Sequence, residues 1–170
     1  MANTFDLIQK VTLTSAASSV SFTSIPSTFN DLAVYISAVG TTAVGAQDLF
    51  IRINNDSSNV YNAQEMTIIQ SGSFANKAVD QSRVNAVQPA ATYPNNRINA
   101  FLYFFNYVGS TRKHFLVDSS MSINATTSWQ LRLTVGDRNN TAVISRLDFL
   151  PQADNFAANS IFTLYGIKNS

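Results

Sequence analysis

Few residues in this chain are of the types that do acid–base or nucleophilic chemistry. It has one histidine, His114, one glutamate, Glu65, and no cysteine. His114 and Asp118 stand four residues apart, so a Ser-His-Asp relay is the first chemistry to consider. On a β-strand these two side chains share a face but lie about 13 Å apart, which is too far for a direct hydrogen bond. We therefore interpret His114 as a polar residue near the end of a strand.

Two carboxylates converging in a groove would indicate glycoside hydrolysis. The ten acids stand mostly at expected strand ends and turns, at no spacing that brings two together: Asp6, Asp31, Asp48, Asp56, Glu65, Asp80, Asp118, Asp137, Asp148 and Asp154. The stretch NNDSSN at 54–59 lacks the spacing and the final glutamate of a calcium loop. Neither a GxSxG elbow nor a glycine-rich phosphate loop is present in the sequence. We therefore expect no catalytic residue, no metal ligand and no cofactor, and we predict that the protein is not an enzyme.

The charge content argues against several classes of partner. Only 12% of the residues are charged and the formal net charge is +1, so we expect neither nucleic acid nor an anionic membrane as a partner. Arg112 and Lys113 form no basic stripe, and we interpret them as a hairpin-turn pair. The sequence has no run of about 18 apolar residues that would predict a membrane-spanning helix. Its first ten residues lack the pattern of a secretion signal.

Uncharged side chains supply the polarity instead. The chain contains 20 Ser, 15 Thr and 18 Asn, which favour turns and sheet edges and compete with the backbone inside helices. A surface of this kind also suits dense packing beside other copies, because like-charge repulsion stays small. The composition therefore favours a β-rich protein.

Alternation of apolar and polar residues with a period of two dominates the chain. It predicts strands within 4–14, with a bulge at Gln9–Lys10, and within 19–26, 31–39, 48–54, 97–107, 113–123, 129–135, 142–151 and 159–167. The segment 65–74 is a further candidate strand, and we predict a long loop over 72–96. The pattern predicts one all-β domain over residues 1–170, an antiparallel β-sandwich of roughly 8–10 strands.

The strand expected at 98–107 is apolar on both faces, so we expect it to be buried on both sides or covered by a neighbouring chain. One of its faces is formed by Phe101, Tyr103, Phe105 and Tyr107. Because this strand is expected to be central, replacing Phe105 by Asp is predicted to abolish folding or assembly through an unpaired buried charge.

The strand at 129–135 alternates more simply. Trp129, Leu131, Leu133 and Val135 stand on one face, and Gln130, Arg132 and Thr134 stand on the other. We expect the apolar face to point inward, with Trp129 in the core. A stacking role for Trp129 on a sugar is the less favoured interpretation.

Three stretches of the chain carry a resemblance to a known group of proteins. They are LTSAASSVSFTSIPSTFNDLAVYISAV at 13–39, INAFLYFFNYVGSTRKHF at 98–115 and VISRLDFLPQADNFAANSIFTLYGIK at 143–168. In this order they resemble structural domains of tailed-bacteriophage virions, and the closing LYGIK is the most specific signature. The resemblance covers nearly the whole chain except about 40–96. It implies a jelly-roll fold in which Leu164, Tyr165, Gly166 and Ile167 are core residues without a catalytic role.

The jelly roll implied by this resemblance explains the apolar strand close to the C-terminus. In such a fold the first and last strands are often neighbours, so we expect the strand 161–167 to be held on both edges. Gly166 has no side chain and would permit a close approach or a bulge beside Tyr165.

The resemblance also carries an expectation about function. Such domains occur as capsid decoration (cement) proteins and as parts of tail fibres. Because the chain is short and begins at its own Met1, we expect a free-standing decoration protein on the outer capsid surface that bridges major capsid protein subunits. We expect a homo-oligomer, with a trimer favoured. The candidate oligomer or shell contacts are the loop 72–96 and the strand residues Phe101, Tyr103, Phe105 and Tyr107.

The alternative is a tail-fibre or receptor-binding module that recognises host surface carbohydrate. A tyrosine can stack on a sugar ring, while amides and a guanidinium form hydrogen bonds to its hydroxyls. The candidate loop contacts of this kind are Tyr93, Asn95, Asn96 and Arg97. Another structural role in the virion, such as a tail-tube or collar protein, fits the same residues.

Overall fold

The computed structural model describes residues 4–41, 48–69, 71–87, 97–122, 129–152 and 155–168. These residues form twelve strands and no helix. The strands are β1 (Phe5–Thr12), β2 (Val20–Phe22), β3 (Asp31–Ala38), β4 (Leu49–Ile53), β5 (Tyr61–Ile69), β6 (Gly72–Gln81), β7 (Val84–Val87), β8 (Ile98–Phe104), β9 (Lys113–Ser122), β10 (Trp129–Arg138), β11 (Leu147–Pro151) and β12 (Ile161–Ile167). This exceeds the expected eight to ten.

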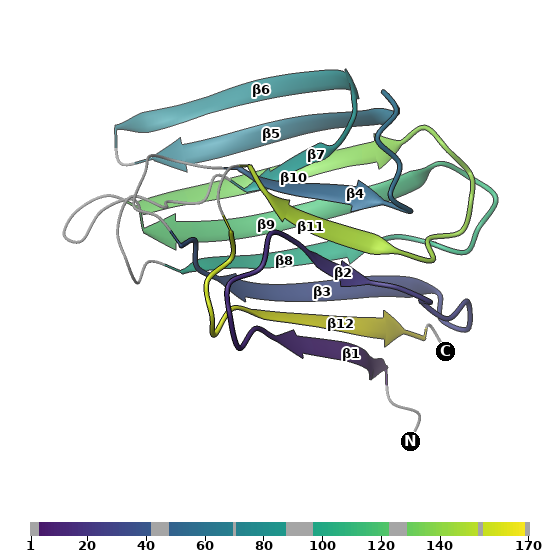
Figure 1. The fold of residues 1–170 in the computed structure, drawn as a ribbon. Coiled ribbons are helices and arrows are strands. Elements are labelled where there is room, and N and C mark those ends of the chain that lie inside the picture. The colour runs from purple at the N-terminus through teal and green to yellow at the C-terminus, as the bar shows by residue number, and fades with distance from the viewer. Residues whose placement is uncertain are drawn as a thin grey trace.

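The strands form two antiparallel sheets that pack face to face (Figure 1). The large sheet has eight strands in the order β1-β12-β3-β8-β9-β10-β5-β6, and the small sheet has four in the order β2-β11-β4-β7. The protein is therefore the all-β antiparallel sandwich that the alternation predicts. Because the small sheet has half as many strands, it covers only part of the large one.

The strand pairing is nested, which defines a jelly roll. β1 pairs with β12, β2 with β11, β3 with β8, and β4 with β7. This is the pairing of one long hairpin that has been rolled up into two sheets. Two further hairpins, β5–β6 and β9–β10, are inserted into this plan and extend the large sheet beyond β8.

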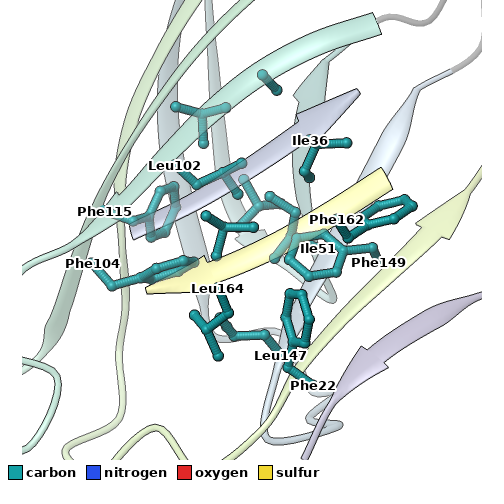
Figure 2. Close-up of a cluster of buried hydrophobic side chains, with 14 of the residues drawn as sticks. Phe22, Ile36, Ile51, Leu102, Phe104, Phe115, Leu147, Phe149, Phe162 and Leu164 are labelled. Atoms are coloured by element: carbon teal, nitrogen blue, oxygen red, sulfur yellow. The ribbon is translucent and has the colours of Figure 1, made fainter. Parts of the chain in front are cut away.

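The core lies between the inner faces of the two sheets (Figure 2). Alternate residues of β3 point into it, as the sequence predicts. The small sheet contributes Phe22, Ile51, Leu147 and Phe149, and the large sheet contributes Ile36, Leu102, Phe104, Phe115, Phe162 and Leu164. Phe149 links the two layers, since its ring centroid lies 5.8 Å from that of Phe22 and 5.6 Å from that of Phe162.

The last strand is held on both edges, as expected. β12 pairs with β1 on one side and β3 on the other, and the bulge in β1 lies between Leu7 and Gln9. A Cβ atom on Gly166 would lie 2.3 Å from the Phe29 ring, so the glycine is required by a close approach. Tyr165 differs from the expectation, because its half-buried ring lies on the outer side of the large sheet.

The predicted loop 72–96 is wrong in its first part. β6 (Gly72–Gln81) and β7 (Val84–Val87) occupy most of it. β6 is the free edge of the large sheet, and its residues are nearly all exposed. It has no buried side to impose an apolar period, so its sequence resembles that of a loop.

The inward face of β10 is the opposite of the one predicted. Gln130, Arg132 and Thr134 are buried, whereas Val135 is 45% exposed and Leu133 is half-buried on the outer side. The side chain of Trp129 lies outside the described residues. β10 belongs to an inserted hairpin, and its inner face meets polar partners at the margin of the small sheet instead of the apolar core.

The aromatic strand ends earlier than predicted. β8 stops at Phe104, and Phe105 is 46% exposed, so the expected buried position for Phe105 is wrong. Tyr107 does not share the face of Phe101, because the turn after β8 carries its side chain into the core. There its hydroxyl donates a hydrogen bond to the Pro26 carbonyl, and burial raises its pKa.

Candidate functional site

The candidate site is the surface of the large sheet that points away from the small sheet, which we call the outer face. Side chains alternate between the two sides of a strand, so every strand of the large sheet contributes to it. Seven of the nine most exposed large hydrophobic side chains among the described residues lie on this face or at its margin. They are Phe5, Leu7, Tyr35, Met66, Val79, Phe105 and Val135. This is an unusual concentration for a surface that water would contact.

Half of the outer face is aromatic. A continuous chain of six rings crosses β1, β12, β3 and β8 in the order Phe5, Tyr165, Tyr35, Phe101, Tyr103 and Phe105. The closest ring centroids are those of Tyr103 and Phe105, at 4.6 Å, and those of Tyr35 and Phe101, at 4.9 Å. Contacts of this kind hold the rings in fixed orientations, so the aromatic half is a preformed surface.

The other half of the outer face is aliphatic and hollowed. A first hollow of about 520 Å³ lies across β9, β10, β5 and β6 and is lined by Phe105, Leu116 and Val135 together with the polar residues His114 and Lys77. A neighbouring hollow of about 450 Å³ is lined by Met66, Ala75, Leu133 and Val135. Both hollows lie beside apolar side chains that no other part of the described chain covers.

A further hollow of about 450 Å³ lies near the middle of the outer face. Its aromatic wall consists of Tyr35 and Phe101, and its polar wall includes Asn99, Asp118 and Ser120. Rings beside amide, carboxylate and hydroxyl groups are a combination that can bind a sugar, by stacking and by hydrogen bonds.

The outer side of the small sheet has a different character. Ser21 donates a hydrogen bond to Asp148 at 2.7 Å, and Arg146 forms an ion pair with the same carboxylate at 2.7 Å. Among the described residues there, the Phe50 ring is covered by the Arg83 guanidinium, 3.8 Å from its centroid. The small sheet therefore presents a polar surface to water, whereas the apolar side chains of the outer face stay open.

One buried acid fixes the aromatic half to the sheet. Tyr103 donates a hydrogen bond to Asp31 Oδ2 at 2.8 Å, and the backbone N–H of Asn106 donates to Oδ1 at 2.6 Å. Asp31 is 7% exposed. Desolvation, together with the hydrogen bond to Asp31 and its negative charge, raises the pKa of Tyr103 to about 12. Asp31 thereby fixes the turn that places Phe105 at the end of the ring chain.

The structure brings together three of the four predicted strand contacts. Phe101, Tyr103 and Phe105 lie side by side on the outer face, and Tyr107 does not. Sequence reasoning missed Tyr35, Tyr165 and Phe5, which complete the ring chain from three other strands. Their alternation with core residues was visible, but the sequence does not show which strands are neighbours.

Of the predicted loop contacts, the structure describes only Arg97, because Tyr93, Asn95 and Asn96 lie outside the described residues. The Arg97 guanidinium donates to the backbone carbonyls of Ser37, at 3.3 Å, and Asn159, at 3.1 Å. These bonds tie the start of β8 to the chain beside β3 and β12. Arg97 therefore has a structural role in this chain, and its side chain remains exposed.

The residues considered for acid–base chemistry and for nucleic acid lie on β9 and in the turn before it. His114 and Asp118 are both exposed on β9. Arg112 forms an ion pair with Asp137 at 3.2 Å. Lys113 is buried and donates to the Gly109 carbonyl, and desolvation lowers its pKa. Lys113 is therefore not presented to solvent.

Two acids that the sequence left apart converge inside the sandwich. Arg132 Nη1 lies 2.9 Å from Glu65 Oε2 and 3.6 Å from Asp48 Oδ1. Burial raises the pKa of Asp48, and the charge of Arg132 opposes this effect. Because one guanidinium links both carboxylates, the arrangement is an internal ion cluster that positions β10, β5 and the start of β4.

The described residues contain no cluster of three or more His, Cys, Asp or Glu side chains placed to hold a metal ion. No helix that could cross a membrane occurs in the same ranges.

Comparison with known proteins returned no relationship: no family model matches the sequence, and neither a curated protein nor a solved structure is significantly similar to the chain.

Proposed function

We propose that the protein is a non-enzymatic structural protein of a tailed-bacteriophage virion. Its proposed role is that of a decoration protein, which bridges major capsid protein subunits on the outer capsid surface. The observation that carries this proposal is the outer face. A chain of aromatic rings adjoins hollows lined by aliphatic side chains, with polar groups between them, on a protein with few charges. Exposed apolar patches of this extent mark places where another protein chain docks, which in a decoration protein is either a second copy or a capsid subunit.

The mechanism of such a protein is multivalent contact. A preformed apolar face loses little conformational entropy on docking, because its rings are already fixed by their neighbours. If several copies bind adjoining subunits together, the effective affinity exceeds that of each contact. A partner that binds the assembled shell and not the free subunit shifts the equilibrium toward the shell.

The decisive experiment is co-sedimentation of the isolated protein with purified empty capsids of the phage that carries it, combined with copy counting in intact virions by quantitative mass spectrometry. We expect saturable binding, hundreds of copies per particle and a raised temperature of capsid disruption. A dozen copies or fewer would place the protein in the tail and contradict the proposal.

A carbohydrate-binding module of a tail fibre is the second candidate, and the hollow between Tyr35, Phe101 and Asp118 favours it. Aromatic rings beside a carboxylate, amide and hydroxyls suit the stacking and hydrogen bonding of a sugar. Screening the protein on a glycan array, with Tyr35→Ala as the matched variant, tests this candidate. Binding that Tyr35→Ala abolishes would support it, and an empty array with strong capsid binding would exclude it.

A further inference from the structure

We propose that the outer face is covered by the outer face of a second copy of this chain, related by a two-fold axis that runs parallel to the strands. The inference shares one premise with the proposed function, which is that another protein chain covers this face. It commits to a self-complementary dimer, in which the same surface of both copies is used, in place of the trimer that the sequence resemblance favours.

The area of the outer face matches the requirement of a stable dimer. Eight strands about 4.8 Å apart, each roughly seven residues long at about 3.3 Å per residue, give a face of roughly 800 Å². Two such faces in contact would bury roughly 1,600 Å², the usual size of a specific protein–protein interface. Packing of one sheet on another at a small angle is also a standard arrangement of β proteins.

The composition of the face selects the direction of the axis. The aromatic half occupies β1, β12, β3 and β8, and the hollowed aliphatic half occupies β9, β10, β5 and β6. An axis parallel to the strands, between β8 and β9, places the aromatic half of each copy over the aliphatic half of the other. The protruding rings then enter the hollows. An axis perpendicular to the strands would place hollow over hollow and leave both empty.

The ladder registers show which residues would meet. Tyr35, Phe101, Asp118 and Leu133 form one row across the sheet, and β3 and β10 are equally far from the axis. Tyr35 therefore faces Leu133 of the second copy, a ring against an aliphatic side chain. In the same row Phe101 faces Asp118 of the second copy, so this carboxylate lies against the edge of a ring.

Two neighbouring rows give contacts of the same kind. Tyr103 on β8 and Leu116 on β9 are ladder partners on either side of the axis. Tyr103 of one copy therefore faces Leu116 of the second copy, and Leu116 of the first faces Tyr103 of the second. In a further row, Ile161 on β12 faces Ile68 on β5 of the second copy. Each of these contacts buries apolar surface on both copies.

The first test is the mass of the protein in solution, measured by sedimentation equilibrium for the wild type and two matched variants. Val135→Glu puts a charge into the hollows of the outer face. The control, Val143→Glu, puts the same charge on an exposed valine between β10 and β11, away from the outer face. The carbonyl of Val143 accepts a hydrogen bond from the Asn54 side chain, and the substitution leaves this backbone group in place. We expect the mass of two chains for the wild type and for Val143→Glu, and the mass of one chain for a folded Val135→Glu.

The second test fixes the arrangement without disturbing the fold. The chain has no cysteine, so single thiols are introduced as Tyr35→Cys and Leu133→Cys. Packed sheets lie roughly 10 Å apart between their backbones, and the two Cys side chains that point into this gap bring the sulfur atoms closer than that. A thiol cross-linker that spans about 8 Å therefore reaches from one to the other. We expect cross-linked dimers when the two variants are mixed, and almost none from Tyr35→Cys alone, because the two copies of that position would be separated by several strands.

Each contrary outcome overturns the inference. A monomeric wild type, a trimer, a dimeric Val135→Glu protein, or efficient cross-linking of Tyr35→Cys to itself would each contradict a two-fold dimer of this kind. A monomer whose capsid binding is lost in Val135→Glu would assign the outer face to a capsid subunit, leaving the proposed function intact. A dimer that binds no capsid would leave the inference standing and contradict the proposed function.

Discussion

The hydroxyl of Tyr103 donates a hydrogen bond to Asp31 Oδ2 at 2.8 Å and joins β8 to the start of β3 at the edge of the outer face. Desolvation, followed by the hydrogen bond to Asp31 and its negative charge, raises the pKa of Tyr103 to about 12 from an ordinary value of 10.0. A raised pKa means that the folded state favours the protonated phenol. The stabilisation is complete below about pH 10 and is lost as the pH rises through about 12.

Tyr103→Phe removes the phenol hydroxyl, so no group titrates at this position. We therefore expect the free energy of unfolding of the wild type to fall between pH 10 and pH 12 relative to that of Tyr103→Phe, with a constant difference from pH 7 to pH 9. Urea denaturation at each pH measures the difference. In Asp31→Asn, the pKa of Tyr103 followed by tyrosine NMR is expected to move part of the way back toward 10. An unchanged pKa there would contradict the role of the Asp31 charge.

Phe104 and Phe105 are adjacent in the sequence and opposite in burial, at 1% and 46% exposed. Phe104→Ala leaves a cavity in the core and is expected to lower the free energy of unfolding by about 3–5 kcal/mol. Phe105→Ala is expected to change it by less than about 1 kcal/mol. Urea denaturation of both variants as monomers tests the pair, and equal losses would contradict the placement of these two rings.

Asp56 and Arg138 form an ion pair in which the guanidinium is buried. Arg138 is 3% exposed, and its Nη2 lies 2.6 Å from Asp56 Oδ2. Asp56→Asn leaves that guanidinium without its counter-charge, so we expect a loss of about 3 kcal/mol at pH 7. Asp6→Asn, which breaks the exposed pair with Lys168, is the matched control and is expected to cost less than about 1 kcal/mol.

The same pair makes stability depend on pH in the acid range. Hydrogen bonds from Ser58, and the pairing with Arg138, lower the pKa of Asp56 to about 2 from an ordinary value of 3.8. A lowered pKa gives stability that is present above about pH 4 and is lost as the pH falls through about 2. The difference between the wild type and Asp56→Asn should therefore shrink between pH 4 and pH 2. A difference that stays constant to pH 2 would rule out this explanation.

Gly166 leaves no room for a side chain beside Phe29. Because an added Cβ would lie 2.3 Å from the ring, we expect Gly166→Ala to lower the free energy of unfolding by about 2 kcal/mol. Shortening the opposing ring tests the cause, since in a Phe29→Ala background the same substitution should cost much less. Additive losses in the double variant would show that the glycine is required for another reason.

The sequence predicted the fold class because alternation survives wherever one side of a strand faces the core. β3 and β4 are of this kind, with Leu32, Val34 and Ile51 buried as expected. β6 could not be recognised, because a free edge exposed on both sides has no apolar period to detect. The resemblance of the chain to phage structural domains stays a prediction.

The candidate site was only partly predictable, for a different reason. Alternation separates the two faces of a strand but does not say which face another layer covers. In β10 the apolar face lies outward, and Arg132 is buried on the inner side with Glu65 and Asp48. The aromatic content of β8 was visible in the sequence, whereas the ring chain that joins it to Tyr35 and Tyr165 depends on strand order.

The position of β12 has a consequence for how the protein is made. β1 is hydrogen-bonded to β12 alone within the large sheet, and β12 also supplies one of the two partners of β3. Since the ribosome delivers residues 161–167 after the other described strands, β1 stays without its neighbour until β12 has been made. Closure of this edge is thus a late step on the ribosome or after release, and until then the nascent chain presents open strands to cellular chaperones.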